Sequence, residues 1–318
     1  MKESIKKIKI AIVSDNKNVN KNPDDQLLAK ALEKQSTDTC LISVDIIDWK
    51  KHPKLTKYDG VYISSTWDHH EHGDQFIKWI QENDHDKKQF VIASSTIIQF
   101  IDKRNYLEPF GQHFGFSSSN KGYVTPSYFI DPLEKDIKTN LEKAFEVLPS
   151  SKKYVVKPRI SADSTMTFLV PSSLVEQKVS SILSEPHRGG VILQPFIESI
   201  QRHGEFQLIY LGGQYAYTLS KDAGYCVHDR SLLKNVPPSL LHFSSRVLDF
   251  LGQSCGGEVP LRVRLDFFLD DHDCPLLSEI ELVEPCLSLS SLPLDLLSSS
   301  LSTLSSSILH RVLSFSSS

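Results

Sequence analysis

Two neighbouring segments within residues 261–287 constrain the fold more than any other part of the chain. The first reads VRLDFF (263–268), and its alternation of apolar and charged residues predicts a β-strand. The acidic sequence DDHDCP (270–275) follows and predicts a turn. A second strand is predicted at 276–283, so the whole stretch is typical of a β-hairpin.

Four charged side chains are predicted to share one face of this hairpin. Residues two apart on a strand point the same way, so Glu279 and Glu281 share a face that Asp266 can join from the neighbouring strand. Arg264, two residues before Asp266, faces the same side. Three carboxylates repel one another, and an oxygen-seeking cation such as Mg²⁺ would relieve the repulsion. The alternative is a solvated acidic face. The apolar neighbours place the hairpin partly inside the protein; they are Leu265, Phe267, Ile280 and Leu282.

Two lysines lie at the ends of predicted elements, where an anion would stabilise them. Lys103 lies at the start of a helix predicted from residue 101, and a positive charge is unfavourable there against the helix dipole. Lys157 lies at the exit of an apolar strand at 154–158, where it could pair with a phosphate. The alternative for each is an ordinary solvated lysine.

The hairpin sequence resembles that of a known family. Arg-x-Asp at 264–266, Glu-x-Glu thirteen residues after the Asp, and Glu284-Pro285 are similar to the metal-binding end of the ATP-grasp ligases. The chain most resembles the glutathione-synthetase-like subgroup that includes the cycloserine-forming ligase. That subgroup favours a second Glu where other ATP-grasp enzymes have Asn. The resemblance extends over nearly the whole chain and is strongest at 154–287.

The resemblance implies that the chain binds ATP and one or two Mg²⁺ ions, with Mn²⁺ as an alternative. Lysines would neutralise the phosphates, the exit of an apolar strand would enclose the adenine ring, and a carboxylate would accept both ribose hydroxyls. The residues implied are, for phosphate, Lys103, Lys157 and Lys221; for adenine, Gln194, Phe196 and Ile197; for ribose, Glu205; for metal, Asp266, Glu279 and Glu281; and for catalysis, Arg264 and Lys221.

Several positions depart from the family pattern. The loop at 159–167 resembles the flexible cover over the phosphates, which usually contains glycine, but this chain has ADS at 162–164. Without glycine, close approach of the backbone to phosphate should be harder. Ser64 and Cys226 stand where relatives often carry Arg, and Gln99-Phe100 stands where the subgroup often has Trp-Asn.

Strands and helices alternate in the first part of the chain, which predicts a small open parallel α/β sheet. Ligands of such sheets bind beyond the carboxyl ends of the strands. The predicted strands are 9–13, 40–47, 61–66 and 89–93.

The sequence TWDHHEH (66–72) follows the third predicted strand. By resemblance, Trp67 and Asp68 lie at the mouth of the acceptor-substrate site. The three histidines also allow a zinc site, although their spacing matches no strong zinc signature. A polar loop that starts a helix is the third alternative.

The predicted fold class is α/β: an open parallel N-terminal lobe followed by an α+β, two-lobed ATP-grasp domain. The predicted divisions are 1–122 for the N-terminal lobe, 123–190 for the middle lobe and 191–318 for the C-terminal lobe. Residues from 288 onward are mostly Ser and Leu, but apolar residues recur every three or four positions at 297–315. This spacing predicts a terminal amphipathic helix packed on the core.

Composition excludes several classes of protein. The net charge is −4 and the pI is about 6.3, so no basic field for nucleic acid is present. No apolar run approaches the ~20 residues that span a membrane. The five cysteines have no metal-binding spacing and suggest reduced thiols and a cytoplasmic protein. A catalytic cysteine is a weaker alternative.

The resemblance to the ATP-grasp ligases implies an ADP-forming ligase that joins a carboxylate to an amine, or a similar nucleophile, through an acyl-phosphate. The chain has no P-loop motif and no nucleophile motif. Two alternatives remain open: a ligase that adds amino acids to a peptide or protein, and a nucleotide-binding pseudoenzyme. The oligomeric state is left open.

Overall fold

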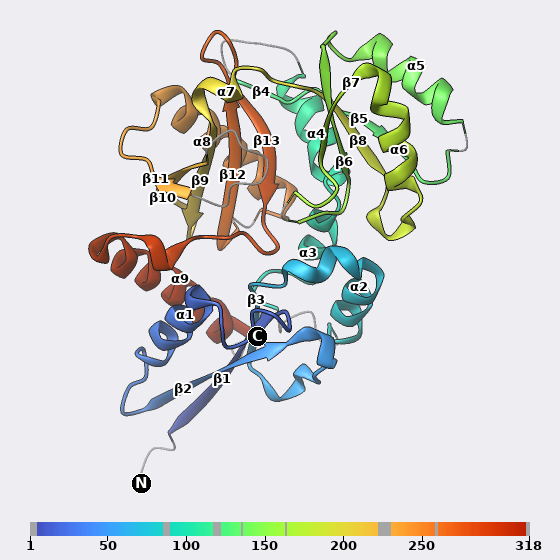
Figure 1. Ribbon diagram of the computed structural model, residues 1–318. Coiled ribbons are helices and arrows are strands. Elements are labelled where there is room, and N and C mark those ends of the chain that lie inside the picture. The colour runs from blue at the N-terminus through green and yellow to red at the C-terminus, as the bar shows by residue number, and fades with distance from the viewer. Residues whose placement is uncertain are drawn as a thin grey trace.

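The chain folds into three lobes, each built on its own β-sheet (Figure 1). The computed structural model describes residues 5–84, 90–116, 122–134, 136–162, 164–221, 230–257 and 260–315. This arrangement confirms the predicted α/β class. Cys226 and the central residue of the ADS segment, Asp163, lie outside the described residues. No helix of the described chain has the length and apolar character needed to cross a membrane.

The N-terminal lobe is a parallel sheet of order β2-β1-β3, as predicted. Its strands are β1 (Lys6–Ser14), β2 (Cys40–Asp48) and β3 (Gly60–Ile63). Its helices are α1 (Pro23–Glu33), α2 (Gly73–Glu82), α3 (Ser94–Ile101) and α4 (Arg104–Phe114). The strand predicted at 89–93 is wrong for its described part: Phe90 forms a single bridge with Val61, and α3 begins at Ser94.

The middle lobe is a four-stranded antiparallel sheet of order β5-β8-β6-β7. It comprises β5 (Tyr128–Ile130), α5 (Ile137–Val147), β6 (Lys153–Pro158), β7 (Phe168–Pro171), α6 (Val175–Leu183) and β8 (Val191–Pro195). The division predicted after residue 190 falls one strand too early, because β8 hydrogen-bonds to β5 and β6. Helix α5 begins where Asp136 caps the backbone N–H of Thr139, at 3.0 Å.

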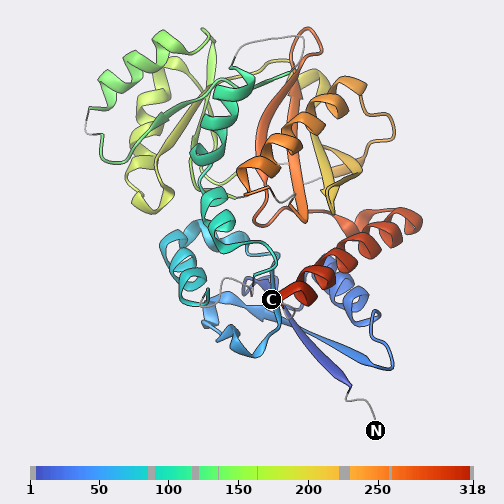
Figure 2. The same ribbon diagram turned by 180° about the vertical axis from the view of Figure 1, so that it is seen from behind.

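The C-terminal lobe is a six-stranded sheet of order β11-β10-β9-β12-β13-β4. Its elements are β4 (Tyr123–Val124), α7 (Ile200–His203), β9 (Glu205–Leu211), β10 (Gln214–Lys221), β11 (Arg230–Leu232), α8 (Pro238–Ser254), β12 (Arg262–Leu269) and β13 (Pro275–Glu281). The predicted hairpin is β12 and β13, and its turn is held by Asp270, whose carboxylate accepts from the backbone of His272 and Cys274. Helices α4 and α8 lie on one face of this sheet (Figure 2), where Phe110 and Phe250 pack edge to face.

The predicted terminal helix is α9 (Leu294–Phe315), which lies between the C-terminal sheet and α1 (Figures 1 and 2). Its buried residues Leu304, Ile308 and Val312 share one core with β1 and β9. A Cβ on Gly60 would lie 2.2 Å from a Val312 methyl group, so the close approach of α9 to β3 needs glycine. The C-terminal helix therefore docks the first lobe onto the last.

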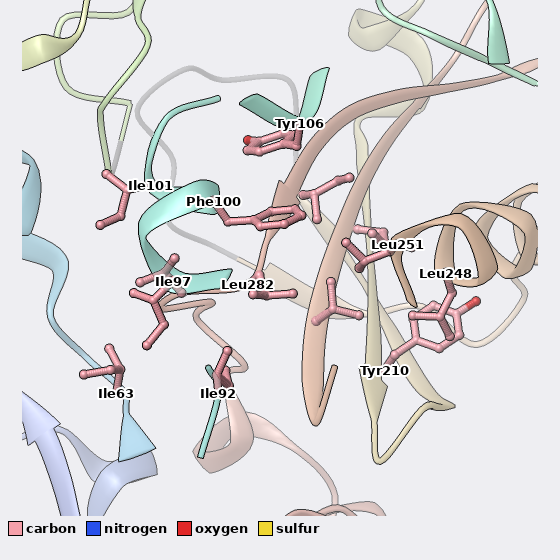
Figure 3. Close-up of a cluster of buried hydrophobic side chains, with 14 of the residues drawn as sticks. Ile63, Ile92, Ile97, Phe100, Ile101, Tyr106, Tyr210, Leu248, Leu251 and Leu282 are labelled. Carbon is pink, nitrogen blue, oxygen red and sulfur yellow. The ribbon is translucent and has the colours of Figure 1, made fainter. Parts of the chain in front are cut away.

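A second core also joins the N-terminal and C-terminal lobes. Figure 3 shows it running from Ile63 and Ile92 past Phe100 on α3 to Leu251 on α8. Beside it, the fully buried Arg262 on β12 donates hydrogen bonds to the backbone carbonyls of residues 63 and 283. These contacts hold the end of β3 against the hairpin.

Candidate functional site

A cavity of about 300 Å³ opens between the middle and C-terminal sheets, with the N-terminal lobe at one end. All but one of the predicted site residues line it; they are Trp67, Lys103, Lys157, Gln194, Phe196, Ile197, Glu205, Lys221, Arg264, Asp266, Glu279 and Glu281. They come from all three lobes, so the fold brings together side chains that are far apart in sequence.

The register of the hairpin brings the acidic residues together as predicted. Asp266 pairs with Glu279 across the strands, and Arg264 pairs with Glu281. One carboxylate oxygen from each of the three acids lies within 4.8 Å of the other two. The donor set is entirely oxygen, which is the set that Mg²⁺ prefers in proteins. These residues therefore fit a Mg²⁺ site.

Arg264 partly neutralises the acidic cluster. Its Nε and Nη2 donate to the two carboxylate oxygens of Asp266, each at 2.8 Å, and Nη2 lies 3.4 Å from Glu281. Burial nevertheless raises the pKa of Glu281 to about 8, with the charges of Glu279 and Glu284 contributing against Arg264. Arg264 therefore does not offset the burial of Glu281, and a divalent cation would stabilise the ionised form of this carboxylate.

Lys103 connects the cluster to the cover loop. It is the N-cap residue of α4, which begins at Arg104; the helix predicted from residue 101 is this one, and α3 ends at Ile101, before it. Its Nζ lies 3.0 Å from Oε1 of Glu279 and donates to the backbone carbonyl of Ser161 at 2.8 Å. Burial would lower the pKa of Lys103, but Glu279 and Glu281 outweigh it and raise the pKa. Burial would likewise raise the pKa of Glu279, but Lys103 and Lys157 lower it to about 2.

The other two predicted phosphate lysines differ in their surroundings. Lys157 is buried, and among the described residues no carboxylate lies within ion-pair distance of it. Burial lowers its pKa, with the charge of Glu279 opposing. Lys221 pairs in register with Glu205, the predicted ribose acid, across β10 and β9. Burial and the charge of Asp266 raise the pKa of Glu205. Within the described chain, Lys157 is thus a cation without an ion-pair partner, facing a cavity.

The segment predicted for adenine follows β8 into the same cavity. The Gln194 side chain is buried and donates to Ser127 Oγ at 2.8 Å. The Phe196 backbone N–H donates to the Lys153 carbonyl at 3.0 Å. Because that N–H is used within the protein, an adenine edge would have to bind other backbone groups of the segment, which continues through Ile197.

Two residues of the cover loop (159–167), neither of them glycine, have left-handed backbone. Ser164 has φ of 56° and Met166 has φ of 57°. This conformation costs non-glycine residues roughly 1–2 kcal/mol each. At the base of the loop, Arg159 Nε donates to both carboxylate oxygens of Asp102, at 3.0 and 3.1 Å, and its Nη1 pairs with Asp131. The loop is therefore attached to the residue that precedes Lys103.

Of the two residues predicted for the acceptor-substrate site, Trp67 lines the cavity and Asp68 does not. Trp67 lines the cavity and lies in a 3₁₀ turn (Trp67–Glu71) after β3. The prediction for Asp68 is wrong in position: its buried carboxylate accepts from Trp49 Nε1 at 2.8 Å and pairs with Lys50 at 2.6 Å, within the N-terminal lobe. The 3₁₀ turn directs neighbouring side chains to different sides, which a loop prediction does not specify.

Two of the three histidines of this segment, His69 and His70, contact backbone carbonyls through Nδ1. Nδ1 of His69 lies 3.0 Å from the Thr66 carbonyl, and Nδ1 of His70 lies 2.6 Å from the Trp67 carbonyl. Among the described residues, the hairpin acids are the one set of three potential ligands close enough to share a metal ion. The zinc alternative therefore has no support in this part of the chain.

The cavity is also lined by residues to which the sequence analysis gave no role in the site, among them Ser161, Arg230 and Glu284. Arg230 on β11 donates through Nε to Oε1 of Gln207 at 2.8 Å. The sequence presents Glu284 only as part of a Glu-Pro pair. Its burial, which raises its pKa to about 7 despite the charge of Lys103, is a tertiary property.

Comparison with known proteins agrees with this geometry. Residues 10–91 match the family model of the N-terminal domain of the D-cycloserine synthetase DcsG. The chain is 24% identical over 261 residues to the cycloserine biosynthesis protein DcsG of Streptomyces lavendulae, which covers 78% of this chain and 83% of that protein. This likeness confirms the predicted resemblance to the cycloserine-forming ligase.

Two solved structures share the fold. The crystal structure of DcsG superposes with a TM-score of 0.80 at 21% identity, over 96% of this chain and 99% of that one. The D-alanine–D-alanine ligase from Bacillus anthracis, complexed with ATP, superposes with a TM-score of 0.63 at 12% identity, over 96% and 97% of the two chains. The three lobes described above are therefore those of the ATP-grasp fold.

Proposed function

We propose that this chain, which has the fold of the ATP-grasp ligases, is an ATP-dependent ligase that joins a carboxylate to an amine and releases ADP and phosphate. One observation carries the proposal. Three carboxylates that fit Mg²⁺ and three lysines from different lobes converge on one cavity of about 300 Å³. Positive and oxygen-donor groups in this number are suited to a triphosphate and its metal.

ATP would lie between the middle and C-terminal sheets. The adenine would contact the segment after β8, and Glu205 would accept the ribose hydroxyls. Lys103, Lys157 and Lys221 would neutralise phosphate oxygens. Lys157 is prepared for this role, because it is buried in the cavity wall without a carboxylate partner among the described residues.

Asp266, Glu279 and Glu281 would hold Mg²⁺, which when bound supplies charge neutralisation and orientation of the phosphates. Arg264 orients Asp266 through two parallel hydrogen bonds, so the position of this ligand is set before any metal arrives. The guanidinium remains on the cavity wall, where it would also stabilise the transferring phosphoryl group.

The reaction would proceed in two displacements. A substrate carboxylate oxygen attacks the γ-phosphorus, and the bond to the β–γ bridging oxygen breaks to release ADP. The amine then attacks the acyl carbon, phosphate leaves, and the amine loses a proton. The residues of the cavity contribute mainly position and charge, and no covalent intermediate with the protein is required.

A nucleotide-binding pseudoenzyme is the second candidate, and the cover loop favours it. Ser164 and Met166 hold left-handed backbone without glycine, and Ser164 lines the cavity, so its side chain occupies space that a glycine would leave to the phosphates. The retained acids and lysines favour the ligase. Both candidates predict ATP binding, and only the ligase predicts turnover.

The decisive experiment measures ADP release by the full-length protein with Mg-ATP and pairs of amino acids. ADP release that depends on both partners and stops in Lys157→Met would support the ligase. A rise in melting temperature with Mg-ATP but no ADP release across the panel would favour the pseudoenzyme. Including a short peptide as acceptor separates small-molecule ligation from peptide ligation.

A further inference from the structure

Glu284 is a buried acid of the cavity that the proposed nucleotide and metal contacts do not use. It lies beyond the end of β13, it is 8% exposed, and it lines the cavity. It is not part of the set of acids that could share one metal ion. An ionised carboxylate that is taken out of water needs a compensating charge or several hydrogen-bond donors.

The described residues supply only part of that compensation, because burial raises the pKa of Glu284 despite the charges of Lys103, Arg262 and Arg264. No Lys or Arg among them lies within ion-pair distance of the Glu284 carboxylate. The one described ionisable side chain within that distance is His69, whose Nδ1 lies 3.4 Å from Oε1. That ring is turned toward the Thr66 carbonyl, which lies at 3.0 Å from the same nitrogen. Burial lowers the pKa of His69 to about 4, so the imidazole is neutral near pH 7. Glu284 therefore lines the cavity with no Lys or Arg of the described chain within ion-pair distance.

The position of Glu284 is also fixed by the N-terminal lobe. Nε1 of Trp67 donates to the Glu284 backbone carbonyl at 3.0 Å. Trp67 and Cys286 line both the main cavity and a second cavity of about 20 Å³ beside it, which is space for about one water molecule. Indole faces also attract alkylammonium groups. This end of the cavity thus combines a fixed acid with an aromatic wall.

We propose that Glu284 is a specificity-determining residue that binds the primary ammonium group of the non-nucleotide substrate, at the end of the cavity nearest the N-terminal lobe. The inference rests on the proposed ligase function, because it names a substrate feature of the same site. An ammonium group fits better than a guanidinium, because His69 already lies against one carboxylate oxygen and a planar fork needs both.

The test uses full-length protein with Mg-ATP and matched ligands. Both enantiomers of alanine are compared with lactate and propionate, which keep the carboxylate but lack the ammonium group. The other amino acids complete the panel. Binding is followed by the shift in melting temperature, and ADP formation is followed separately. The wild type should respond to at least one amino acid and at least tenfold more weakly to its deaminated analogue.

Glu284→Gln removes the charge at almost constant size. It should weaken the response to that amino acid at least tenfold and leave the shift caused by Mg-ATP unchanged, while Glu82→Gln, the same change on an exposed part of α2, should alter neither. Equal half-saturation in Glu284→Gln and wild type would overturn the inference. An equal response of the wild type to alanine and to lactate or propionate would also overturn it, and this comparison needs no variant. A wild type that responds to no amino acid would overturn it as well.

The two proposals fail separately. Amino-acid binding that depends on Glu284 but gives no ADP would remove the ligase function and keep the ammonium site. ADP formation that is unchanged in Glu284→Gln, with the same KM for the amino acid, would keep the ligase and remove the ammonium site.

Discussion

The ammonium group of Lys103 lies 3.0 Å from Oε1 of Glu279, so a lysine predicted for phosphate and an acid predicted for metal form one ion pair. The same lysine donates to Ser161 in the cover loop. Glu279 therefore belongs to both halves of the site. Changes at this residue should affect metal-dependent nucleotide binding and stability together.

Glu279→Gln should abolish most of the rise in melting temperature that Mg-ATP produces. The variant loses a charged metal ligand, and a hundredfold loss of affinity removes about 2.7 kcal/mol of ligand stabilisation. It also leaves the buried Lys103 without its nearest carboxylate, so the protein without ligand should lose about 1–3 kcal/mol. Thermal unfolding with and without Mg-ATP measures both effects.

The matched control is Glu82→Gln, which removes an exposed acid 3.8 Å from Lys78. It should change the free energy of unfolding by no more than about 0.5 kcal/mol, whether Mg-ATP is present or absent. A full Mg-ATP response in Glu279→Gln would contradict the assignment of the metal site.

Lys157→Met should separate stability from function. The ammonium is buried without a carboxylate partner among the described residues, so its removal should leave the free energy of unfolding unchanged or raise it by about 1 kcal/mol. ATP should bind at least tenfold more weakly, since one phosphate contact is lost. Urea unfolding and ATP titration provide the two measurements.

Lys152→Met, on an exposed position before β6, serves as the control. Loss of stability without loss of ATP affinity would show that the lysine is structural.

Asp102 and Arg159 should be strongly coupled. Their side chains are 14% and 11% exposed, and Arg159 Nε contacts both oxygens of Asp102. A double-mutant cycle with Asp102→Asn and Arg159→Gln should give a coupling free energy of about 1–3 kcal/mol. The exposed pair Arg202 and Asp271 should give less than about 0.5 kcal/mol. Equal coupling in the two pairs would mean that the base of the cover loop is not held by this contact.

His69 should make the protein sensitive to acid. Its pKa is about 4 in the folded protein and about 6.5 when unfolded, so the unfolded chain binds more protons between these values. The free energy of unfolding is unaffected by this group above pH 6.5, where His69 is neutral in both states. It falls as the pH drops toward 4, by up to about 3 kcal/mol, because the unfolded chain takes up the proton first. The difference in urea stability between pH 7 and pH 4.5 should shrink in His69→Gln. It should stay the same in His310→Gln, an exposed position on α9. An unchanged difference in His69→Gln would show that this histidine is not buried in its neutral form.

Local pattern was enough to predict the hairpin and its acidic face. The side-chain period of a strand depends on the backbone of a few successive residues, so the order of residues alone places Glu279 and Glu281 on one face. The register of the hairpin, seen in the structure, adds Asp266 to them. The terminal helix followed from the same kind of argument, because the spacing of its leucines outweighs its many serines. The phosphate lysines were identified by resemblance, and their common cavity is consistent with it.

What only the tertiary structure decided is which distant groups meet. Three features depend on contacts between segments far apart in sequence: the place of β8 in the middle sheet, the hydrogen bond from Trp49 to Asp68, and the burial of Glu284. Sequence periodicity describes the neighbours of a residue along the backbone. Desolvation and charge compensation depend on neighbours in space, and the docking of three lobes and α9 creates those.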